Sequence, residues 1–249
     1  MFSREAITAL SSSRSVAVLT GAGVSAESGV PTFRGAGGLW RNHQATSLAT
    51  PEAFQSDPRL VWEFYNYRRE LLAPLKPNPG HFAIAALEEK APEFTLITQN
   101  IDNLHRVAGT RNLIELHGNI WRVRCADPAC GGAAEPRENR AVPIDPIPPL
   151  CGECGGYLRP HVVWFGEMLD PGGLRAAMDA VRKCDFFIVA GTSAVVQPAA
   201  TMPLLARQAG AFVLEINPDP TELSGALNES VPEPSGEALP RLVEAAFGG

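Results

Sequence analysis

The stretch Val16-Ala17-Val18-Leu19-Thr20-Gly21-Ala22-Gly23-Val24-Ser25-Ala26 is the part of the sequence that decides the fold. Its first five residues are apolar or β-branched, as expected of a buried strand. The spacing Gly21-x-Gly23-x-x-Ala26 satisfies the relaxed fingerprint of a dinucleotide-binding loop, in which bare backbone and a helix N-terminus face a pyrophosphate. The stretch therefore predicts a strand that leads into a phosphate-binding loop.

Three downstream runs, 94–98, 186–190 and 212–216, are also apolar and rich in residues that favour strands. Helical patterns lie between them, at 79–90 and at 173–183, where apolar residues recur with a helical period. Alternating strands and helices are typical of a parallel sheet that helices cover on both faces. The sequence therefore predicts an α/β fold with a doubly wound parallel sheet.

The composition excludes some classes of protein. The chain has 249 residues, enough for one large domain with a small inserted module. A formal net charge of −6 and a pI near 5.4 disfavour a nucleic-acid surface, because neutralising phosphates requires clustered Lys and Arg. The start, Met1-Phe2-Ser3-Arg4-Glu5, lacks a signal-peptide pattern, and no apolar run approaches membrane-spanning length. We expect a cytoplasmic protein with no nucleic-acid or membrane partner.

Four of the five cysteines form two close pairs around a stretch rich in proline, glycine and charge. Cys125 and Cys130 enclose four residues, and Cys151 and Cys154 enclose two. Such pairs around a segment too polar to build its own core predict one structural zinc ion held by four thiolates. Two disulfides or unpaired thiols are the alternative, and a catalytic zinc is disfavoured because the module contains no histidine. We expect Cys184, the fifth cysteine, to be a core or boundary residue.

The residues that follow the glycine loop carry a family resemblance. The segment 21–35, Gly-Ala-Gly-Val-Ser-Ala-Glu-Ser-Gly-Val-Pro-Thr-Phe-Arg-Gly, resembles the signature of the sirtuins. Other blocks resemble the family in the same order along the chain: Thr98-Gln99-Asn100-Ile101-Asp102-Asn103-Leu104-His105, Leu116-His117-Gly118-Asn119, the cysteine pairs, Gly191-Thr192-Ser193 and Ile216-Asn217. The resemblance extends from about Ala6 to about Phe247.

This resemblance implies a division into a Rossmann-like NAD-binding large domain and a small domain. The large domain would comprise residues 1–34, 80–120 and 160–249. The small domain would have a helical part at 35–79 and a zinc-binding part at 121–159. NAD, as co-substrate, and an acyl-lysine peptide would meet between the two domains.

The resemblance also implies a reaction and its base. The acyl oxygen of the substrate attacks the anomeric carbon of the nicotinamide ribose, nicotinamide leaves, and a base removes the proton of the ribose 2′-hydroxyl so that it attacks the resulting imidate. His117 is implied as this base, since a histidine titrates near neutral pH. An isolated histidine at a strand end would otherwise be interpreted as structural, and His105 keeps that interpretation.

The residues implied to contact NAD come from several strand ends. They are Gly21, Ala22, Gly23, Glu27, Phe33, Arg34, Gln99, Asn100, Ile101, Asp102, Gly191, Thr192, Ser193 and Asn217. Asn100 and Asp102 would serve equally well in an Asx-rich turn that caps a helix, and both roles can hold together.

The acyl group and the peptide have their own candidate residues. Tyr65 and Arg68 are three residues apart, so on a helix they share a face. The resemblance implies that they hold the distal carboxylate of succinyl or malonyl groups, while acetyl groups are also removed. The alternative is that Arg68 and Arg69 are solvated charges that pair with Glu63 or Glu70. The segment His161–Glu167 resembles the one that pairs with the peptide backbone, and its implied contacts are Val162, Val163, Phe165 and Gly166.

Three functions fit these observations. The first is an NAD-dependent deacylase that acts on acyl-lysine proteins or peptides as a monomer. The second is a mono-ADP-ribosyltransferase. The third is a non-enzymatic sensor of NAD or ADP-ribose, which would need the glycine loop but not a base at His117.

Overall fold

The computed structural model of this protein describes residues 1–31, 39–41 and 43–248. Its main feature is a six-stranded sheet in which all neighbouring strands are parallel and the order is β11-β10-β9-β1-β4-β5. The strands are β1 (Ser15–Thr20), β4 (Glu93–Thr98), β5 (Leu113–Glu115), β9 (Phe186–Ala190), β10 (Phe212–Ile216) and β11 (Glu229–Val231). The chain moves outward from β1 to β5, returns beside β1 at β9, and moves outward again. The direction reverses between β1 and β9, which is where open α/β sheets bind their ligands.

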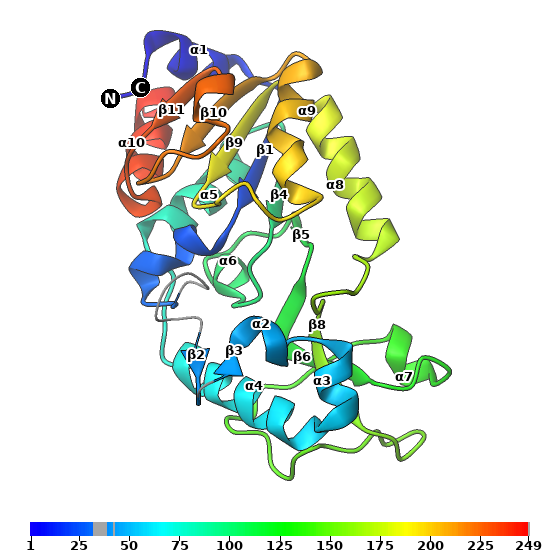
Figure 1. Cartoon of the computed structure of the whole chain (residues 1–249). Helices are drawn as coiled ribbons and strands as arrows, with labels where there is room; N and C mark the ends of the chain where they lie inside the picture. The colour runs from blue at the N-terminus through cyan, green and yellow to red at the C-terminus, as the bar shows by residue number, and fades with distance from the viewer. Residues whose placement is uncertain (32–38, 42, 249) are drawn as a thin grey trace.

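Helices cover both faces of this sheet (Figure 1). One face packs against α1 (Arg4–Ser12), α5 (Pro79–Lys90) and α10 (Ser235–Phe247), and the other against α8 (Pro171–Lys183) and α9 (Met202–Gln208). Successive strand residues point to opposite faces, so Val18 belongs to the first core while Leu19 belongs to the second. The predicted doubly wound parallel sheet is confirmed.

A smaller lobe is built from two segments of the chain, one between β1 and β4 and the other between β5 and β9. It contains α2 (Ala45–Leu48), α3 (Pro51–Ser56), α4 (Pro58–Leu72), α7 (Gly131–Ala134) and two antiparallel sheets. One sheet has the order β7-β6-β8, formed by β6 (Gly118–Cys125), β7 (Arg137–Glu138) and β8 (Leu158–Val162). The other pairs β2 (Leu39–Trp40) with β3 (His43–Gln44).

Helix α4 holds the irregular chain between β7 and β8 in place. Asn66 donates to the Ile144 carbonyl and accepts from the Ile144 N–H, both at 2.9 Å. Arg69 is 1% exposed, and its guanidinium donates to the carbonyl oxygens of Ile120 and Ala141. Because a loop without its own ladder must pair its carbonyls elsewhere, these side chains replace secondary structure there. Arg69 is therefore not the solvated helix charge of the alternative interpretation.

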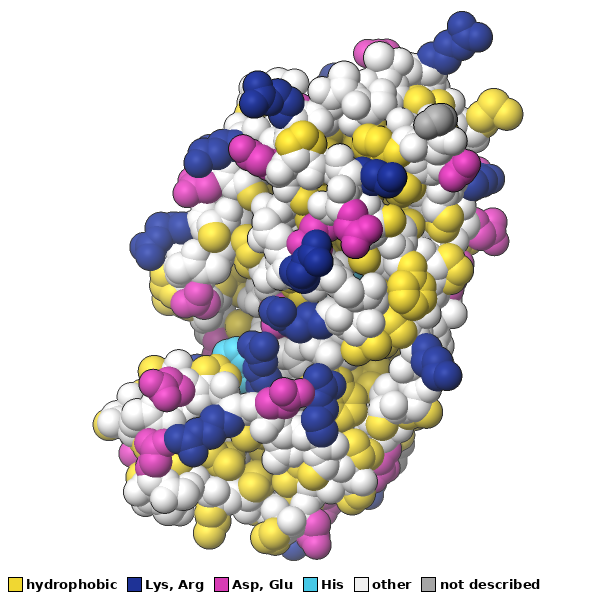
Figure 2. All heavy atoms as spheres, turned by 180° about the vertical axis from the view of Figure 1, so that it is seen from behind, with side chains coloured by type: hydrophobic (Ala, Val, Ile, Leu, Met, Phe, Trp, Pro, Cys, Tyr) yellow, Lys and Arg dark blue, Asp and Glu magenta, His cyan; other side chains and the backbone are white. Residues whose placement is uncertain are grey.

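Short elements complete the chain between the two lobes and near the sheet. They are the 3-10 helices η1 (Ala22–Ser28), η3 (Ala199–Thr201) and η4 (Ser224–Ala226), and the helix α6 (Leu104–Val107). The glycine loop thus leads into a 3-10 helix rather than an α-helix. Figure 2 shows the two lobes from behind, joined at a waist where Lys and Arg side chains lie beside Asp and Glu. None of the helices in the described part of the chain has the length and apolar character needed to span a bilayer.

Candidate active site and cysteine cluster

Glycines bring the carboxyl ends of β1 and β9 into contact. The Gly21 N–H donates to the Ala190 carbonyl at 3.1 Å, and the Gly23 N–H donates to the Gly191 carbonyl at 2.8 Å. A Cβ on Gly23 would lie 2.7 Å from the Cα of Gly191, and a Cβ on Gly191 would lie 2.2 Å from the Val24 nitrogen. Gly191 also has a φ of +58°, which other residues rarely adopt. The bare backbone at this point suits the close approach of a pyrophosphate.

The remaining residues expected around NAD lie at neighbouring strand ends. Thr192, directly after Gly191, is buried, and its hydroxyl accepts from the Gln99 side-chain amide at 3.0 Å. Ser193 follows half-buried, and Asn217 follows β10 with its side-chain amide donating to the Asp219 carbonyl at 2.7 Å. The structure therefore brings the blocks at 99, 191–193 and 217 to one edge of the sheet.

Four further residues were expected to contact NAD. The Glu27 carboxylate accepts from the Gly236 N–H at 2.6 Å in the first turn of α10, where a negative charge stabilises a helix. Ala22, which begins the 3-10 helix that also contains Glu27, is half-buried. Phe33 and Arg34 lie outside the described residues.

A buried polar network surrounds the end of β4. The side-chain amide of Asn100 donates to the Gly21 carbonyl at 3.0 Å, which links the ends of β4 and β1. The Asp102 carboxylate accepts from the Ser25 hydroxyl at 2.7 Å and from the Leu104 N–H at 2.8 Å. Burial raises the pKa of Asp102, and these hydrogen bonds partly oppose that rise. Asp102 thus caps the turn before α6, as the structural interpretation predicted, and both side chains lie near the end of β4.

Two buried histidines extend this network beneath the turn. His105 is 2% exposed and lies 3.0 Å from the Thr20 hydroxyl, while the rings of His81 and His105 are 4.7 Å apart. Burial lowers the pKa of His81 to about 4, and it lowers the pKa of His105 well below its ordinary value. Both rings are therefore neutral at pH 7, which agrees with the structural role expected of His105. The contacts of Ser25 with Asp102 and His81 in this network were not predicted. Ser25 was considered only as part of the loop signature, and His81 was not considered.

His117 lies in the turn between β5 and β6, half-buried. Its Nδ1 is 3.0 Å from the Gln99 carbonyl oxygen, and the His117 carbonyl accepts from the Val163 N–H at 2.9 Å. Burial lowers the pKa of His117, and the hydrogen bond to Gln99 partly opposes the drop. A neutral imidazole fixed through one nitrogen can accept a proton on the other.

Tyr65 and Arg68 are one turn apart on α4. Tyr65 is 1% exposed, and its hydroxyl oxygen accepts from the indole N–H of Trp164 at 2.9 Å. Burial lowers the pKa of Arg68, while the nearby Tyr65 and Asp102 raise it. Glu63, one of the partners considered for Arg68, pairs with Arg41 at 2.7 Å. Arg68 thus lies within electrostatic range of both Tyr65 and the buried turn after β4.

The segment expected to bind the peptide follows β8. Val162 ends that strand and pairs with Gly118, so the segment starts next to His117. The N–H groups of Val163 and Phe165 donate to the carbonyls of His117 and Ala49, each at 2.9 Å. Phe165 is 52% exposed, and Gly166 has a φ of +87°.

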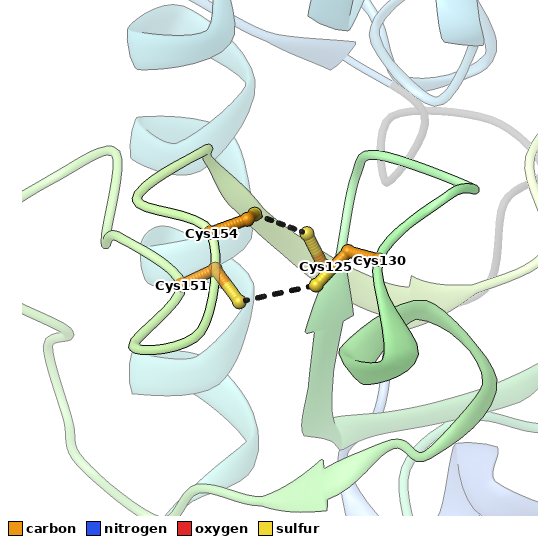
Figure 3. A group of neighbouring side chains, drawn as sticks. All are labelled: Cys125, Cys130, Cys151 and Cys154. Atoms are coloured by element: carbon orange, nitrogen blue, oxygen red, sulfur yellow. Dashed lines mark hydrogen bonds between the residues drawn. The ribbon is translucent and has the colours of Figure 1, made fainter.

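The four paired cysteines converge in the smaller lobe, where they point toward one another (Figure 3). Cys125 ends β6, Cys130 precedes α7, and Cys151 and Cys154 lie in the turn before β8. Their sulfur atoms all lie within 4.8 Å of one another, with 3.5 Å between Cys125 and Cys154. A disulfide needs about 2.05 Å, whereas zinc–sulfur bonds of about 2.3 Å place tetrahedral sulfurs about 3.8 Å apart. The cluster fits a structural zinc ion rather than two disulfides.

Cys184 lies apart from that cluster, in the core of the larger lobe. It is 5% exposed, and its thiol donates to the Val181 carbonyl at 3.3 Å. The expected role as a small core residue is confirmed.

Comparison with known protein families gives a clear result. The model of the Sir2 family matches residues 21–198. The chain is 50% identical over 235 residues to "NAD-dependent protein deacylase 2" of Pyrobaculum aerophilum, covering 94% of this chain and 92% of that protein. It is 45% identical over 253 residues to "NAD-dependent protein deacylase 1" of Pseudomonas aeruginosa, covering 99% and 100% of the two chains.

Solved structures of Sir2 proteins match this chain over its whole length. A Sir2 homologue in complex with NAD superposes with a TM-score of 0.93 at 45% identity, covering 100% of this chain and 95% of that chain. A Sir2 complex with a p53 peptide and NAD⁺ gives a TM-score of 0.84 at 32% identity, with 100% of both chains covered. The larger lobe and its switch point define a Rossmann-like nucleotide-binding protein. The chain belongs to the Sir2 family, as the sequence blocks predicted.

Proposed function

We propose that this protein is an NAD-dependent protein-lysine deacylase, which removes acyl groups from lysine side chains with NAD as co-substrate. The observation that carries the proposal is the position of His117. It is fixed on one side by the carboxyl end of β4 and on the other by the segment after β8. A base at this position lies between the nucleotide crevice and the peptide segment, where an NAD-dependent transfer to or from a peptide must occur.

The chain's own residues supply binding, orientation and one proton transfer. NAD, when bound, would supply an electrophilic ribose carbon for the acyl oxygen, with nicotinamide as the leaving group. Gly21, Gly23 and Gly191 would cradle the pyrophosphate. Gln99 and Asn100 would orient the ribose, and Ile101 and Asp102 would hold the nicotinamide carboxamide. The Nε2 atom of His117 would accept the proton of the ribose 2′-hydroxyl, because Nδ1 is held by the Gln99 carbonyl.

The peptide substrate would lie along the segment after β8. Since the N–H groups of Val163 and Phe165 are bonded within the protein, we expect the peptide to pair with their carbonyl oxygens and with Gly166. Val162, in the preceding strand, would support this edge. A relative solved with a p53 peptide supports a protein substrate for this chain.

We propose that the acyl groups include succinyl and malonyl as well as acetyl. A distal carboxylate would accept from the guanidinium of Arg68 and from the hydroxyl of Tyr65. Burial raises the pKa of Tyr65 to about 12, so its hydroxyl stays protonated and able to donate. An arginine and a phenol side by side form a donor set that suits a carboxylate.

Further proposals concern the organisation of the chain. Cys125, Cys130, Cys151 and Cys154 would hold one zinc ion that stabilises the smaller lobe and takes no part in the chemistry. Reduced thiols at this cluster fit a cytoplasmic location. The domain boundaries given above and the monomeric state stay predictions.

One experiment separates the enzyme from its two alternatives. The protein is incubated with NAD labelled in the adenine ring and with acetyl- and succinyl-lysine peptides. A deacylase places the label in free acyl-ADP-ribose, whereas an ADP-ribosyltransferase places it on protein. Label that stays in unconsumed NAD, bound to the protein, would indicate a sensor.

A further inference from the structure

Tyr65 is held in a hydrogen bond of fixed direction. The only polar group on an indole ring is an N–H, which can donate but not accept. In the 2.9 Å contact between Trp164 Nε1 and the Tyr65 hydroxyl, the tyrosine oxygen must therefore be the acceptor. Among the described groups, none accepts the phenolic hydrogen of Tyr65.

This direction changes what Tyr65 can recognise. A tyrosine hydroxyl ordinarily both donates and accepts, so it tolerates many partners. Here Trp164 uses an accepting lone pair, and the bond leaves the hydroxyl with a proton to donate in a buried site. Arg68, one turn away, cannot accept that proton. The matching partner is a group that only accepts, which is the chemistry of a carboxylate.

Trp164 is itself immobilised from several sides. Its ring is 2% exposed, lies 5.2 Å from the ring of Phe54, and has the guanidinium of Arg159 stacked 3.4 Å from its centroid. Glu167 accepts from the backbone N–H of Trp164 at 2.9 Å and forms an ion pair with Arg159. The indole therefore has one orientation, and Tyr65 takes its orientation from the indole.

We infer that Trp164 is a positioning residue for acyl specificity, which holds Tyr65 as a donor toward acyl groups that end in a carboxylate. This role rests on the proposed function, because it needs Tyr65 and Arg68 to bind the acyl group. It also links two parts of the site, since Trp164 lies within the segment 162–166 that would bind the peptide.

A double-mutant cycle tests this role. Trp164→Phe removes the N–H but keeps an aromatic ring for Arg159 and Phe54. We expect the ratio of kcat/KM for a succinyl-lysine peptide to kcat/KM for a matched acetyl-lysine peptide to fall about two- to tenfold, as for loss of one neutral hydrogen bond, with the succinyl-specific loss appearing in KM. In a Tyr65→Phe background, Trp164→Phe should have no further effect on desuccinylation, because the hydroxyl that it positions is gone.

A matched control uses Trp62, another buried indole of the same lobe. Trp62 donates its N–H to the Leu158 carbonyl at 2.9 Å, so Trp62→Phe should lower the melting temperature without changing the ratio of desuccinylation to deacetylation. Equal effects of Trp164→Phe in the two Tyr65 backgrounds would overturn the positioning role. If Tyr65→Phe and Arg68→Met themselves leave the succinyl preference unchanged, the proposed acyl site fails instead, so the two failures are distinguishable.

Discussion

The Nδ1 atom of His117 lies 3.0 Å from the carbonyl oxygen of Gln99, the residue directly after β4. A carbonyl oxygen can only accept, so Nδ1 carries the hydrogen and Nε2 carries the lone pair when the ring is neutral. The parallel sheet thus fixes the tautomer of the proposed base. The same β4 end positions Asn100 and Asp102, so base and nucleotide contacts are built on one rigid element.

Replacing His117 with Ala should abolish deacylation while leaving the fold and most of the NAD binding intact. A general base contributes about a hundredfold to ten-thousandfold in rate, and the loss should be at least of that order. Steady-state turnover and NAD titration by calorimetry measure the two effects. His43→Ala, at an exposed position in β3, serves as the control. Near-normal turnover by His117→Ala would rule out the assignment.

The pH dependence of kcat/KM should reflect the depressed pKa of His117. Burial is the main cause of this shift from the ordinary value of 6.5, and it disfavours the protonated ring. The base is therefore neutral and active at pH 7, and activity should be lost only as the pH falls below about 6.5. A pH–rate profile between pH 5 and 9 measures it. An acid limb centred above pH 7 would show that another group controls the rate.

The cysteine cluster should hold one zinc ion per chain. Cys125→Ser removes one of four thiolates, so metal analysis should show loss of zinc together with loss of soluble, active protein. Cys184→Ser should behave as the parent, because Cys184 lies in the core of the larger lobe. Full zinc occupancy in Cys125→Ser would disprove the four-thiolate site.

Arg68→Met should damage desuccinylation much more than deacetylation. Losing a hydrogen bond to a charged group costs about 1.5 to 3 kcal/mol, which is roughly tenfold to a hundredfold in kcat/KM. Most of the loss should appear in KM, since the carboxylate would be bound in the ground state as well. Competition between matched peptides gives the ratio directly. Equal loss of both activities would mean that Arg68 has a structural role.

Much of the larger lobe could be predicted because its central strands are largely buried. The runs at 94–98, 186–190 and 212–216 are apolar throughout or nearly so, and each coincides with a strand. The edge strands β5 and β11 are only three residues long and half-buried, so no comparable pattern marks them. The helix after the glycine loop is a 3-10 helix, which the fingerprint spacing alone does not distinguish.

The candidate site also contains residues that the sequence could identify and contacts that it could not. His117 and the cysteines lie in local blocks, so the sequence could single them out. The bond between Trp164 and Tyr65 joins residues 99 positions apart, and no local pattern predicts it. Arg69 was considered as a solvated charge that pairs with Glu63 or Glu70, yet it is buried and donates to the carbonyls of Ile120 and Ala141. These acceptors are more than 50 positions away in the chain, so helix periodicity does not predict the contacts.

The most direct measurement follows the three products of the reaction. The protein is incubated with NAD and an acyl-lysine peptide, and nicotinamide, deacylated peptide and acyl-ADP-ribose are quantified by mass spectrometry. If the protein is a deacylase with His117 as base, all three form in equal amounts, and His117→Ala forms no deacylated peptide. If the parent protein releases nicotinamide without deacylated peptide, or transfers ADP-ribose to protein, the assignment as a deacylase is contradicted.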